Sequence, residues 1–308
     1  MGMSEPISLP SPVLIIGVRG FLGAHLARHL AESGVAVRGT TRSADTRTPP
    51  AGVKHLFSWN GEDSEALVPL LNGAEAVINL AGTPLKTTPW TRRYQERIRE
   101  SRIRSAAALM TALSGRRKTV RVLQASAVGF YGDTRDNWVS ENSPPGHGFL
   151  ARLVTDWEAA AGALRPSRIS LALIRTGVVL HSSGGALKRL RQIQRPGVTP
   201  MPGGGNQWLS WIHLEDYLRA LSFLLSRPDI TGPFNLCAPQ PVRFAAFSTL
   251  ASRKAKRTIA IRVPAGLVRF FLGVAAEPLL VGQRARPAKL EDAGFRFKHP
   301  ELDPRMQF

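Results

Sequence analysis

The fold is decided near the start of the chain by the stretch Val13-Leu14-Ile15-Ile16-Gly17-Val18-Arg19-Gly20-Phe21-Leu22-Gly23. Its first four residues are apolar and partly β-branched, which favours a buried strand. A GxxGxxG spacing and a helical pattern from Gly20 to Ser33 follow directly. Strand, glycine-rich turn and helix in this order predict a dinucleotide-binding loop, because the glycines allow a tight turn and close approach of the backbone to a pyrophosphate. The N–H groups at the start of the helix would bind the phosphates. The alternative is a purely structural glycine-rich turn.

Strand-like and helical patterns alternate through the first 180 residues. We expect strands at 13–16, 35–41, 53–57, 76–80, 120–125 and 169–174, and helices at 20–33, 62–71, 91–113 and 149–164. Strands separated by helices of this length predict an α/β fold with a doubly wound parallel Rossmann sheet. We place this cofactor domain at residues 12–180. Glycine and proline clusters break the pattern afterwards, which predicts a smaller C-terminal substrate lobe over residues 181–308.

The end of the second strand indicates the type of cofactor. Enzymes that bind NAD usually carry an acidic residue there, which bonds the ribose 2′-hydroxyl. Here the chain reads Arg38-Gly39-Thr40-Thr41-Arg42-Ser43, and the first acid is Asp45. Arg42 can instead pair with a 2′-phosphate, and Arg19 can lie on its other side. NADP(H) is therefore favoured over NAD(H), with solvated surface arginines as the alternative.

The expected fourth strand ends in Asn79-Leu80 and leads into the small residues Ala81 and Gly82. They would let the backbone approach the cofactor, unless they form a simple strand-ending turn.

The charge of the chain is unusual. Among 308 residues there are 41 Lys and Arg against 22 Asp and Glu, a formal net charge of +19. The excess lies in two segments, 86–121 and 243–298, each with a net charge of +9. No nucleic-acid-binding motif accompanies it, so we expect no specific nucleic-acid partner. A composition that is 43% hydrophobic and 20% charged excludes a disordered chain or a coiled coil.

Cysteine content and hydropathy bear on the compartment. The single cysteine, Cys237, excludes an intramolecular disulfide and fits a reducing compartment. The N-terminus has no apolar signal region, so we expect a cytoplasmic protein. The most apolar stretch, 263–282, is interrupted by Arg269, Glu277 and Pro278, so no membrane span is expected. We predict a core helix pair there, with a membrane-surface helix as the alternative.

Several further motifs occur together. They are Ser126-Ala127-Val128-Gly129-Phe130-Tyr131-Gly132, Arg175-Thr176-Gly177-Val178-Val179-Leu180, Trp211-Ile212-His213-Leu214-Glu215-Asp216 and Gly282-Gln283-Arg284. With the glycine loop and Asn79–Gly82, they resemble the extended short-chain dehydrogenase/reductase superfamily, and within it the epimerase family of nucleoside-diphosphate-sugar epimerase type. The resemblance implies a small uncharacterised C-terminal domain at about 255–303, adds Gly177 and Val178 to the expected cofactor contacts, and is compatible with a homodimer.

This sequence matches only part of the set of catalytic residues that the family uses. Extended members use a Ser or Thr at the end of the fifth strand and a Tyr-x-x-x-Lys pair on the next helix, whose Tyr moves a proton. Ser126 matches the first position. Phe149 and Leu153 stand where the Tyr and Lys are expected, and Tyr131 lies in a turn where the family commonly has a non-catalytic Tyr. The usual Tyr and Lys are thus predicted to be absent.

Helix geometry adds one candidate. At 100° per residue, Arg102 falls on the otherwise apolar face of the helix expected at 91–113. A buried Arg is rare unless it is paired or faces a ligand. We predict that Arg102 faces the cofactor or substrate cleft, with a buried ion pair as the alternative.

The expected site therefore has two parts. The proposed cofactor contacts are Gly17, Arg19, Gly20, Phe21, Leu22, Gly23, Arg42, Leu80, Ala81, Gly82, Gly177 and Val178, and the proposed catalytic residues are Ser126 and Arg102. No His, Cys and carboxylate spacing implies a metal, and His213 is expected to have a hydrogen-bonded structural role.

Three functions remain open. The first is an NADP(H)-dependent oxidoreductase or epimerase acting on a small or nucleotide-linked substrate. The second is a non-catalytic NADP(H) sensor, and the third, indicated by charge alone, is a module that binds polyanions or a membrane surface.

Overall fold

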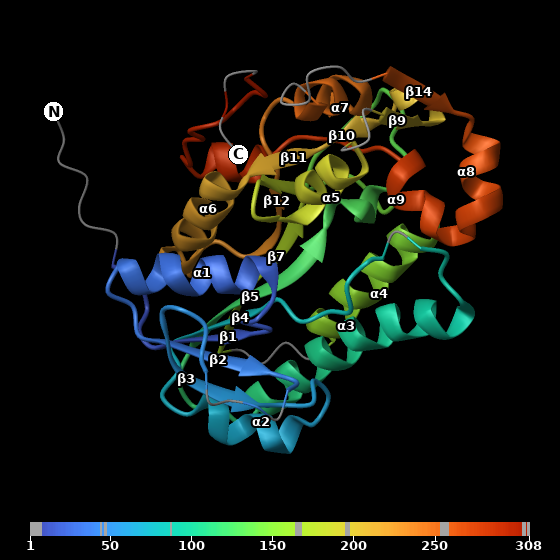
Figure 1. Cartoon of the computed structure of the whole chain (residues 1–308). Coiled ribbons are helices and arrows are strands. Elements are labelled where there is room, and N and C mark those ends of the chain that lie inside the picture. Colours follow the sequence, from blue (N-terminus) through green and yellow to red (C-terminus); the bar gives the residue numbers. More distant parts are fainter. Residues whose placement is uncertain are drawn as a thin grey trace, which may run out of the picture.

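A seven-stranded parallel sheet forms the centre of the computed structural model (Figure 1), which describes residues 8–43, 45, 48–86, 88–163, 168–194, 198–252, 259–303 and 306. The strand order is β12-β7-β5-β4-β1-β2-β3, and every pair is parallel. The strands are β1 (Val13–Ile16), β2 (Val37–Thr41), β3 (Val53–Ser58), β4 (Ala76–Asn79), β5 (Val120–Ala127), β7 (Ile169–Thr176) and β12 (Gly232–Leu236). The predicted doubly wound Rossmann sheet is confirmed.

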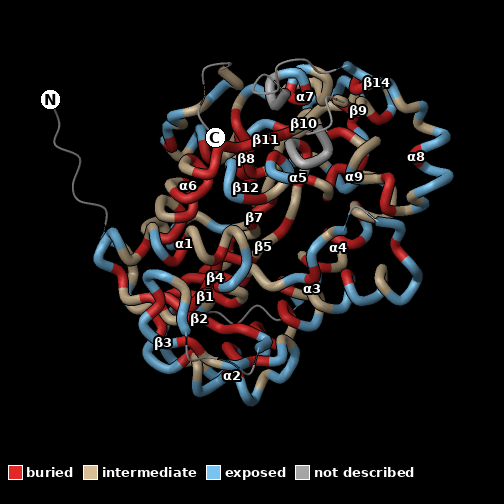
Figure 2. Tube along the Cα trace, viewed as in Figure 1, coloured by how far each residue is buried: buried red, intermediate tan, exposed pale blue. Residues whose placement is uncertain are grey.

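Alternate side chains of β1 enter two separate cores, because successive residues of a strand point to opposite faces. Val13 and Ile15 pack with α1 (Phe21–Glu32) and α6 (Leu214–Ser226), whereas Leu14 and Ile16 pack with α2 (Ser64–Leu71) and α3 (Arg92–Leu113). A fifth helix, α4 (Phe149–Gly162), packs beside α3. Both faces of the sheet are therefore covered, and the central strands are almost wholly buried (Figure 2).

The remaining elements form a smaller lobe (Figure 1), and most of them follow β7 in the chain. Its short strands pair as β6 (Trp138–Val139) with β15 (Arg284–Ala285), β8 (Val178–His181) with β11 (Trp211–His213), β9 (Val198–Pro202) with β14 (Ile259–Val263), and β10 (Trp208–Leu209) with β13 (Val242–Arg243). The helices are α5 (Gly185–Gln194), α7 (Phe244–Ser252), α8 (Ala265–Leu272), α9 (Glu277–Leu280) and α10 (Ala288–Asp292), with 3₁₀ turns η1 (Val128–Tyr131), η2 (Gly203–Gly205) and η3 (Gly273–Ala276).

The two parts interleave in space. Although α6 and β12 follow residue 180, α6 packs on the central sheet and β12 is its edge strand, paired with β7. A division of the chain at residue 180 therefore does not separate two bodies, because the chain returns from the lobe to complete the sheet. The start of the small C-terminal domain expected at about 255 lies outside the described residues.

The prediction of a core helix pair at 263–282 is wrong for α8. That stretch forms α8, η3 and α9. Among its hydrophobic residues, only Val268, Ala275 and Ala276 are buried. Phe270 and Phe271 are exposed, at 81% and 67%. Hydropathy reports that a segment is apolar but not whether another element covers it.

Candidate functional site

A cavity of about 570 Å³ opens where β1, β2 and β4 end. Parallel α/β sheets bind ligands at this edge, where successive strands lead their loops to a common point. The lining residues that sequence reasoning had proposed are Gly17, Arg19, Gly20, Arg42, Leu80, Ala81 and Gly82. Three separate segments of the chain are thus brought to one cavity.

The glycine loop is packed too tightly for side chains. Gly17 has a φ of +82°, and a Cβ there would lie 3.3 Å from the backbone of Leu80 and Ala81. A Cβ on Gly23 would lie 2.6 Å from the carbonyl oxygen of Gly17. The helix that follows, α1, has Gly20 as its N-cap residue, which offers no side chain to cap it, and has no acid in its first turn. Its first N–H groups and its positive dipole end therefore suit an anion such as a diphosphate.

Arg42 and Arg19 differ in what their guanidinium groups already bind. Arg19 donates to the carbonyl oxygens of Asp45 (3.1 Å) and Thr48 (3.0 Å), so it fixes the loop after β2. Arg42 is exposed on the cavity and makes no hydrogen bond or ion pair with any residue that the structure describes. Of the two, Arg42 has the more available cation.

Two further arginines reach the cavity from α3. Arg104 is paired with Glu62 (2.7 Å) and Glu100 (3.1 Å). Arg97 lies about two turns earlier on the same helix. Sequence reasoning missed both, together with Ser101, Trp59 and Asn60, which also line the cavity. Trp59 and Asn60 follow β3, so the rule that ligands bind at strand ends would have found them.

The turn after β4 is held by a buried amide. The side chain of Asn79 is fully buried, and its Nδ2 donates to Ser105 Oγ (3.1 Å) and Gln124 Oε1 (3.0 Å). Its Oδ1 accepts from the N–H of Ala81 at 3.1 Å. Asn79 thereby fixes the backbone that forms one wall of the cavity.

Arg102 lies directly behind this wall. Its Nη1 donates to the carbonyl oxygens of Thr83 and Ile98, both at 3.0 Å, and its Cζ lies 5.3 Å from the ring centroid of Trp157. No carboxylate lies within 4.0 Å of it among the described residues, so the buried ion pair considered as an alternative is not what the structure has. Burial lowers the pKa of Arg102 to about 10. Its neighbours Gly82, Thr83 and Ser101 line the cavity, whereas Arg102 is not one of the lining residues.

Ser126 belongs to a separate polar network at the carboxyl end of β5. Its hydroxyl donates to Glu158 Oε1 at 2.5 Å, and the Glu158 carboxylate pairs with Arg175. Arg175 Nη1 donates to Tyr131 Oη (3.0 Å), and the Tyr131 hydroxyl donates to Asn235 Oδ1 (2.7 Å). The network joins β5, η1, α4, β7 and β12. Sequence reasoning missed Glu158, because nothing in a helical pattern shows that one acid of α4 turns inward.

The first two turns of α4 contain the two positions, Phe149 and Leu153, where the family has Tyr and Lys. Phe149 packs against Trp90 with ring centroids 5.9 Å apart, and the side chain of Leu153 is buried. The backbone N–H groups of Phe149 and Leu150 both donate to the carboxylate of Glu277, each at 2.9 Å. Neither side chain can transfer a proton, and the helix terminus already has an anionic cap.

The other proposed cofactor residues lie beside the cavity without lining it. Gly184 approaches the ring of Phe21 so closely that a Cβ would overlap it, and Leu22 packs on the core. Gly177 abuts the backbone of Ser210, whose carbonyl oxygen accepts from the N–H of Val178 at 2.8 Å. These contacts join the lobe to the start of α1.

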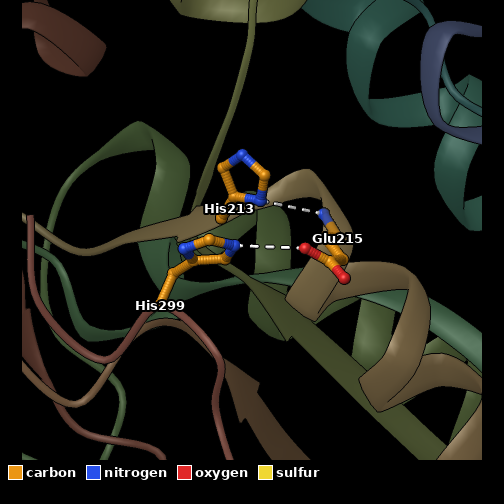
Figure 3. A group of neighbouring side chains, drawn as sticks. All are labelled: His213, Glu215 and His299. Carbon is orange, nitrogen blue, oxygen red and sulfur yellow. Dashed lines mark hydrogen bonds and ion pairs between the residues drawn. The ribbon is translucent and has the colours of Figure 1, made fainter. Parts of the chain in front are cut away.

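The structure also brings together His213, Glu215 and His299 (Figure 3), which sequence spacing could not reveal. His213 Nδ1 accepts from the N–H of Glu215 (3.2 Å), which confirms the structural role expected for His213 as the N-cap of α6. The Glu215 carboxylate binds His299 Nε2 (3.2 Å) and the ammonium of Lys298. These interactions engage atoms that a metal ion would require and tie the C-terminal segment to α6.

Comparison with known proteins gives consistent matches over nearly the whole chain. The model of the NAD dependent epimerase/dehydratase family matches residues 13–237, and a domain of unknown function, DUF1731, matches residues 263–307. An epimerase family protein of Mycobacterium bovis is 39% identical over 288 residues, which cover 93% of each chain.

Two solved structures show the same similarity. The crystal structure of human epimerase family protein SDR39U1 with NADPH has a TM-score of 0.81 at 27% identity, covering 95% of this chain and 97% of that one. The nucleoside-diphosphate sugar epimerase of Corynebacterium glutamicum has a TM-score of 0.73 at 30% identity, covering 95% of this chain and 56% of that one. No helix in the described part of the chain has the length and apolarity needed to cross a membrane.

Proposed function

Because the chain belongs to the NAD dependent epimerase/dehydratase family, we propose that it is an NADP(H)-binding protein and an oxidoreductase or epimerase acting on a small or nucleotide-linked substrate. The observation that carries the proposal is the cavity in which three features meet: an uncapped helix start, a tightly packed glycine loop, and Arg42, which has no ion-pair partner among the described residues. Gly17, Gly20 and the first N–H groups of α1 would hold the diphosphate. When bound, the nicotinamide would supply a hydride donor or acceptor.

The positive charge at the end of β2 is the reason to propose NADP(H) rather than NAD(H) as the cofactor. A 2′-phosphate is dianionic near neutral pH, and a guanidinium binds it through charge-assisted hydrogen bonds. Arg42 lines the cavity and forms no ion pair with the part of the chain that the structure describes, and no acid follows β2 before Asp45. The NADPH in the human SDR39U1 structure supports the same choice.

For the chemical step, we propose that Ser126 orients a substrate oxygen and that Arg102 supplies positive charge behind the loop formed by Gly82 and Thr83. The Ser126 hydroxyl donates a hydrogen bond to Glu158, so the lone pairs of its oxygen remain available to accept from a substrate N–H or O–H group. Since Phe149 and Leu153 cannot exchange a proton, a substrate group or water must do so.

A second candidate, a non-catalytic NADP(H) sensor, is favoured by the same two apolar residues. It shares the cofactor site with the first candidate and predicts no hydride transfer to any substrate.

Cofactor binding is tested by titrating the protein with NADPH and NADH and following tryptophan fluorescence, to which Trp59 in the cavity wall contributes. We expect NADPH to bind at least tenfold more tightly, and Arg42→Asp to reverse the preference, because a lost charged hydrogen bond costs roughly 1.5–3 kcal/mol. Arg296→Asp is the matched control, since Arg296 is exposed and does not line the cavity. Unchanged NADPH affinity in Arg42→Asp would refute the role of Arg42.

Catalysis is tested separately by exchange of hydride from isotopically labelled NADPH over a panel of carbonyl compounds and sugar nucleotides. Label transfer that is lost in Ser126→Ala, with cofactor affinity retained, would support the enzyme. Cofactor binding without transfer across the panel would favour the sensor.

A further inference from the structure

The C-terminal part of the chain exposes an unusual group of large apolar side chains. Ile259 and Ile261 of β14 are 73% and 46% exposed, and Leu267, Phe270 and Phe271 of α8 are 51%, 81% and 67% exposed. These five residues, the apolar patch, are five of the seven large hydrophobic side chains exposed in the described chain. Single exposed apolar residues are ordinary, whereas a group of this kind marks an interaction surface.

The residues of the apolar patch lie on two elements that only Pro264 separates in the chain. Positions 267, 270 and 271 have the i, i+3 and i+4 spacing that puts side chains on one face of a helix, while Val268 turns toward the protein. On the other side of Pro264, β14 pairs with β9 and with no other described strand. Both elements lie at the rim of the molecule (Figure 1) and are coloured mainly as exposed in Figure 2.

The charge around the apolar patch indicates what covers it. Residues 259–276, which contain both elements, have two basic residues, Arg262 and Arg269, and no Asp or Glu. Arg262 and Arg269 lie within the two elements and are exposed, and their guanidinium groups make no hydrogen bond or ion pair with any described residue. A second copy docked through the same face would bring these like charges together, whereas an anionic surface would neutralise them.

The shape of the elements favours a lipid surface over an acidic protein. α8 has eight residues, about 12 Å, and cannot cross a hydrocarbon core of about 30 Å. Short elements with aromatic and aliphatic side chains outward and arginines beside them suit the headgroup boundary of an anionic bilayer. The two phenylalanines are also more exposed than Leu267 of the same helix, as expected for side chains that enter the acyl region.

We propose that β14 and α8 bind the surface of anionic phospholipid membranes. The apolar patch enters the outer part of one leaflet, and Arg262 and Arg269 bind phosphate groups of the lipids. The contact is peripheral and does not depend on the cofactor site.

The test uses the full chain with vesicles of phosphatidylcholine alone or mixed with phosphatidylglycerol, separated by sedimentation. We expect binding to the mixed vesicles at low salt, weakened by added salt as charges are screened. Because the whole chain carries a net charge of +19, charge alone gives some binding. The double variant Phe270→Ser with Phe271→Ser keeps every charge, and we expect it to bind about tenfold more weakly or worse, since exposed phenylalanines contribute through buried apolar area. Val68→Ser, which removes an exposed apolar residue of α2, is the matched control and should bind as the unchanged protein does.

A second measurement does not depend on weakening the protein. Cys237 is buried, so in a Phe270→Cys variant only the new thiol reacts with an environment-sensitive fluorophore. A blue shift with mixed vesicles, absent for the same label at Val68→Cys, supports insertion. The proposal would be overturned if the Phe270→Ser, Phe271→Ser variant bound vesicles as well as the unchanged protein, or if the label showed no shift. It would also be overturned if light scattering showed a dimer that this double variant dissociates. NADPH titration of the same variants separates it from the proposed function, because cofactor affinity should not change.

Discussion

The carboxylate of Glu158 binds the guanidinium of Arg175 through two parallel contacts, Oε1 to Nε and Oε2 to Nη2, both 2.8 Å. The side chains are 10% and 5% exposed, respectively, and Arg175 lies 3.5 Å from the ring centroid of Phe130. Two opposite charges are thus taken out of water at the end of β7 and satisfied almost entirely by each other and by Ser126 and Tyr131. The pair ties α4 to the central sheet beside the proposed catalytic serine.

Removing one member of this pair should be strongly destabilising. Glu158→Ala leaves the buried charge of Arg175 without its partner, and we expect the free energy of unfolding to fall by about 3 kcal/mol. Urea unfolding followed by circular dichroism measures the change. Asp156→Ala is the control on the same helix, because Asp156 pairs with Arg99 at side-chain exposures of 41% and 52% and should cost less than about 1 kcal/mol. Equal effects of the two substitutions would contradict this account.

The glycine loop should tolerate no methyl group at its third glycine. In Gly23→Ala the new Cβ would lie 2.6 Å from the carbonyl oxygen of Gly17, so the loop must shift. We expect a loss of about 2 kcal/mol in stability together with weaker cofactor binding, measured by thermal unfolding with and without NADPH. Gly115→Ala, where nothing lies within 4 Å of the new atom, should leave both unchanged.

Arg102 should matter more for ligand binding than for stability. Its cation is buried without a described carboxylate, so Arg102→Met removes a desolvation cost together with two hydrogen bonds to backbone carbonyls. We expect the free energy of unfolding to change by less than about 1 kcal/mol, while NADPH raises the melting temperature less than in the unchanged protein. A large loss of stability with an unaltered NADPH response would assign Arg102 a structural role only.

The protein should lose stability as the solution becomes mildly acidic. Burial is the largest cause that lowers the pKa of His29 below its ordinary value of 6.5, and the pKa values of His25 and His181 are lowered for the same first reason. Below about pH 6.5 the unfolded chain therefore binds protons that the folded chain binds less readily, and the free energy of unfolding falls with falling pH. Urea unfolding between pH 7.5 and 5.5, about one unit on either side of that value, measures the slope. His29→Gln should reduce it, and an unchanged slope in this variant would contradict the account.

The Rossmann half could be predicted from the sequence because its signals are local. Val13–Ile16 and Ala76–Asn79 are buried on both faces and are apolar except for Asn79. The glycine spacing marks the turn between β1 and α1. The predicted strand ends were within two residues of those observed for β1 to β7 of the central sheet. The candidate cofactor cavity followed from the same rule that strands end at a common edge.

The rest depended on contacts between distant residues. Glu158 meets Arg175 only because α4 crosses β7, and Glu215 meets His299 across 84 positions. Neither is visible in a periodic pattern. The apolar residues of α8 were read as core because hydropathy cannot distinguish a covered face from an exposed one. The helical pattern placed Arg102 on an apolar face, but the carbonyl oxygens of Thr83 and Ile98 that it binds could be identified only in the structure.

The cap that Glu277 forms on α4 joins the two matched segments of the chain. Glu277 lies within the segment matched by the domain of unknown function, while Phe149 and Leu150 lie within the epimerase/dehydratase match. The boundary between the two sequence families is therefore not a boundary in the molecule. An anionic substrate group that approached the start of α4 would have to displace a carboxylate from the same two N–H groups. The C-terminal segment thus occupies the anion-binding position at the start of α4. A fragment that ended before Glu277 would leave these two N–H groups without that carboxylate.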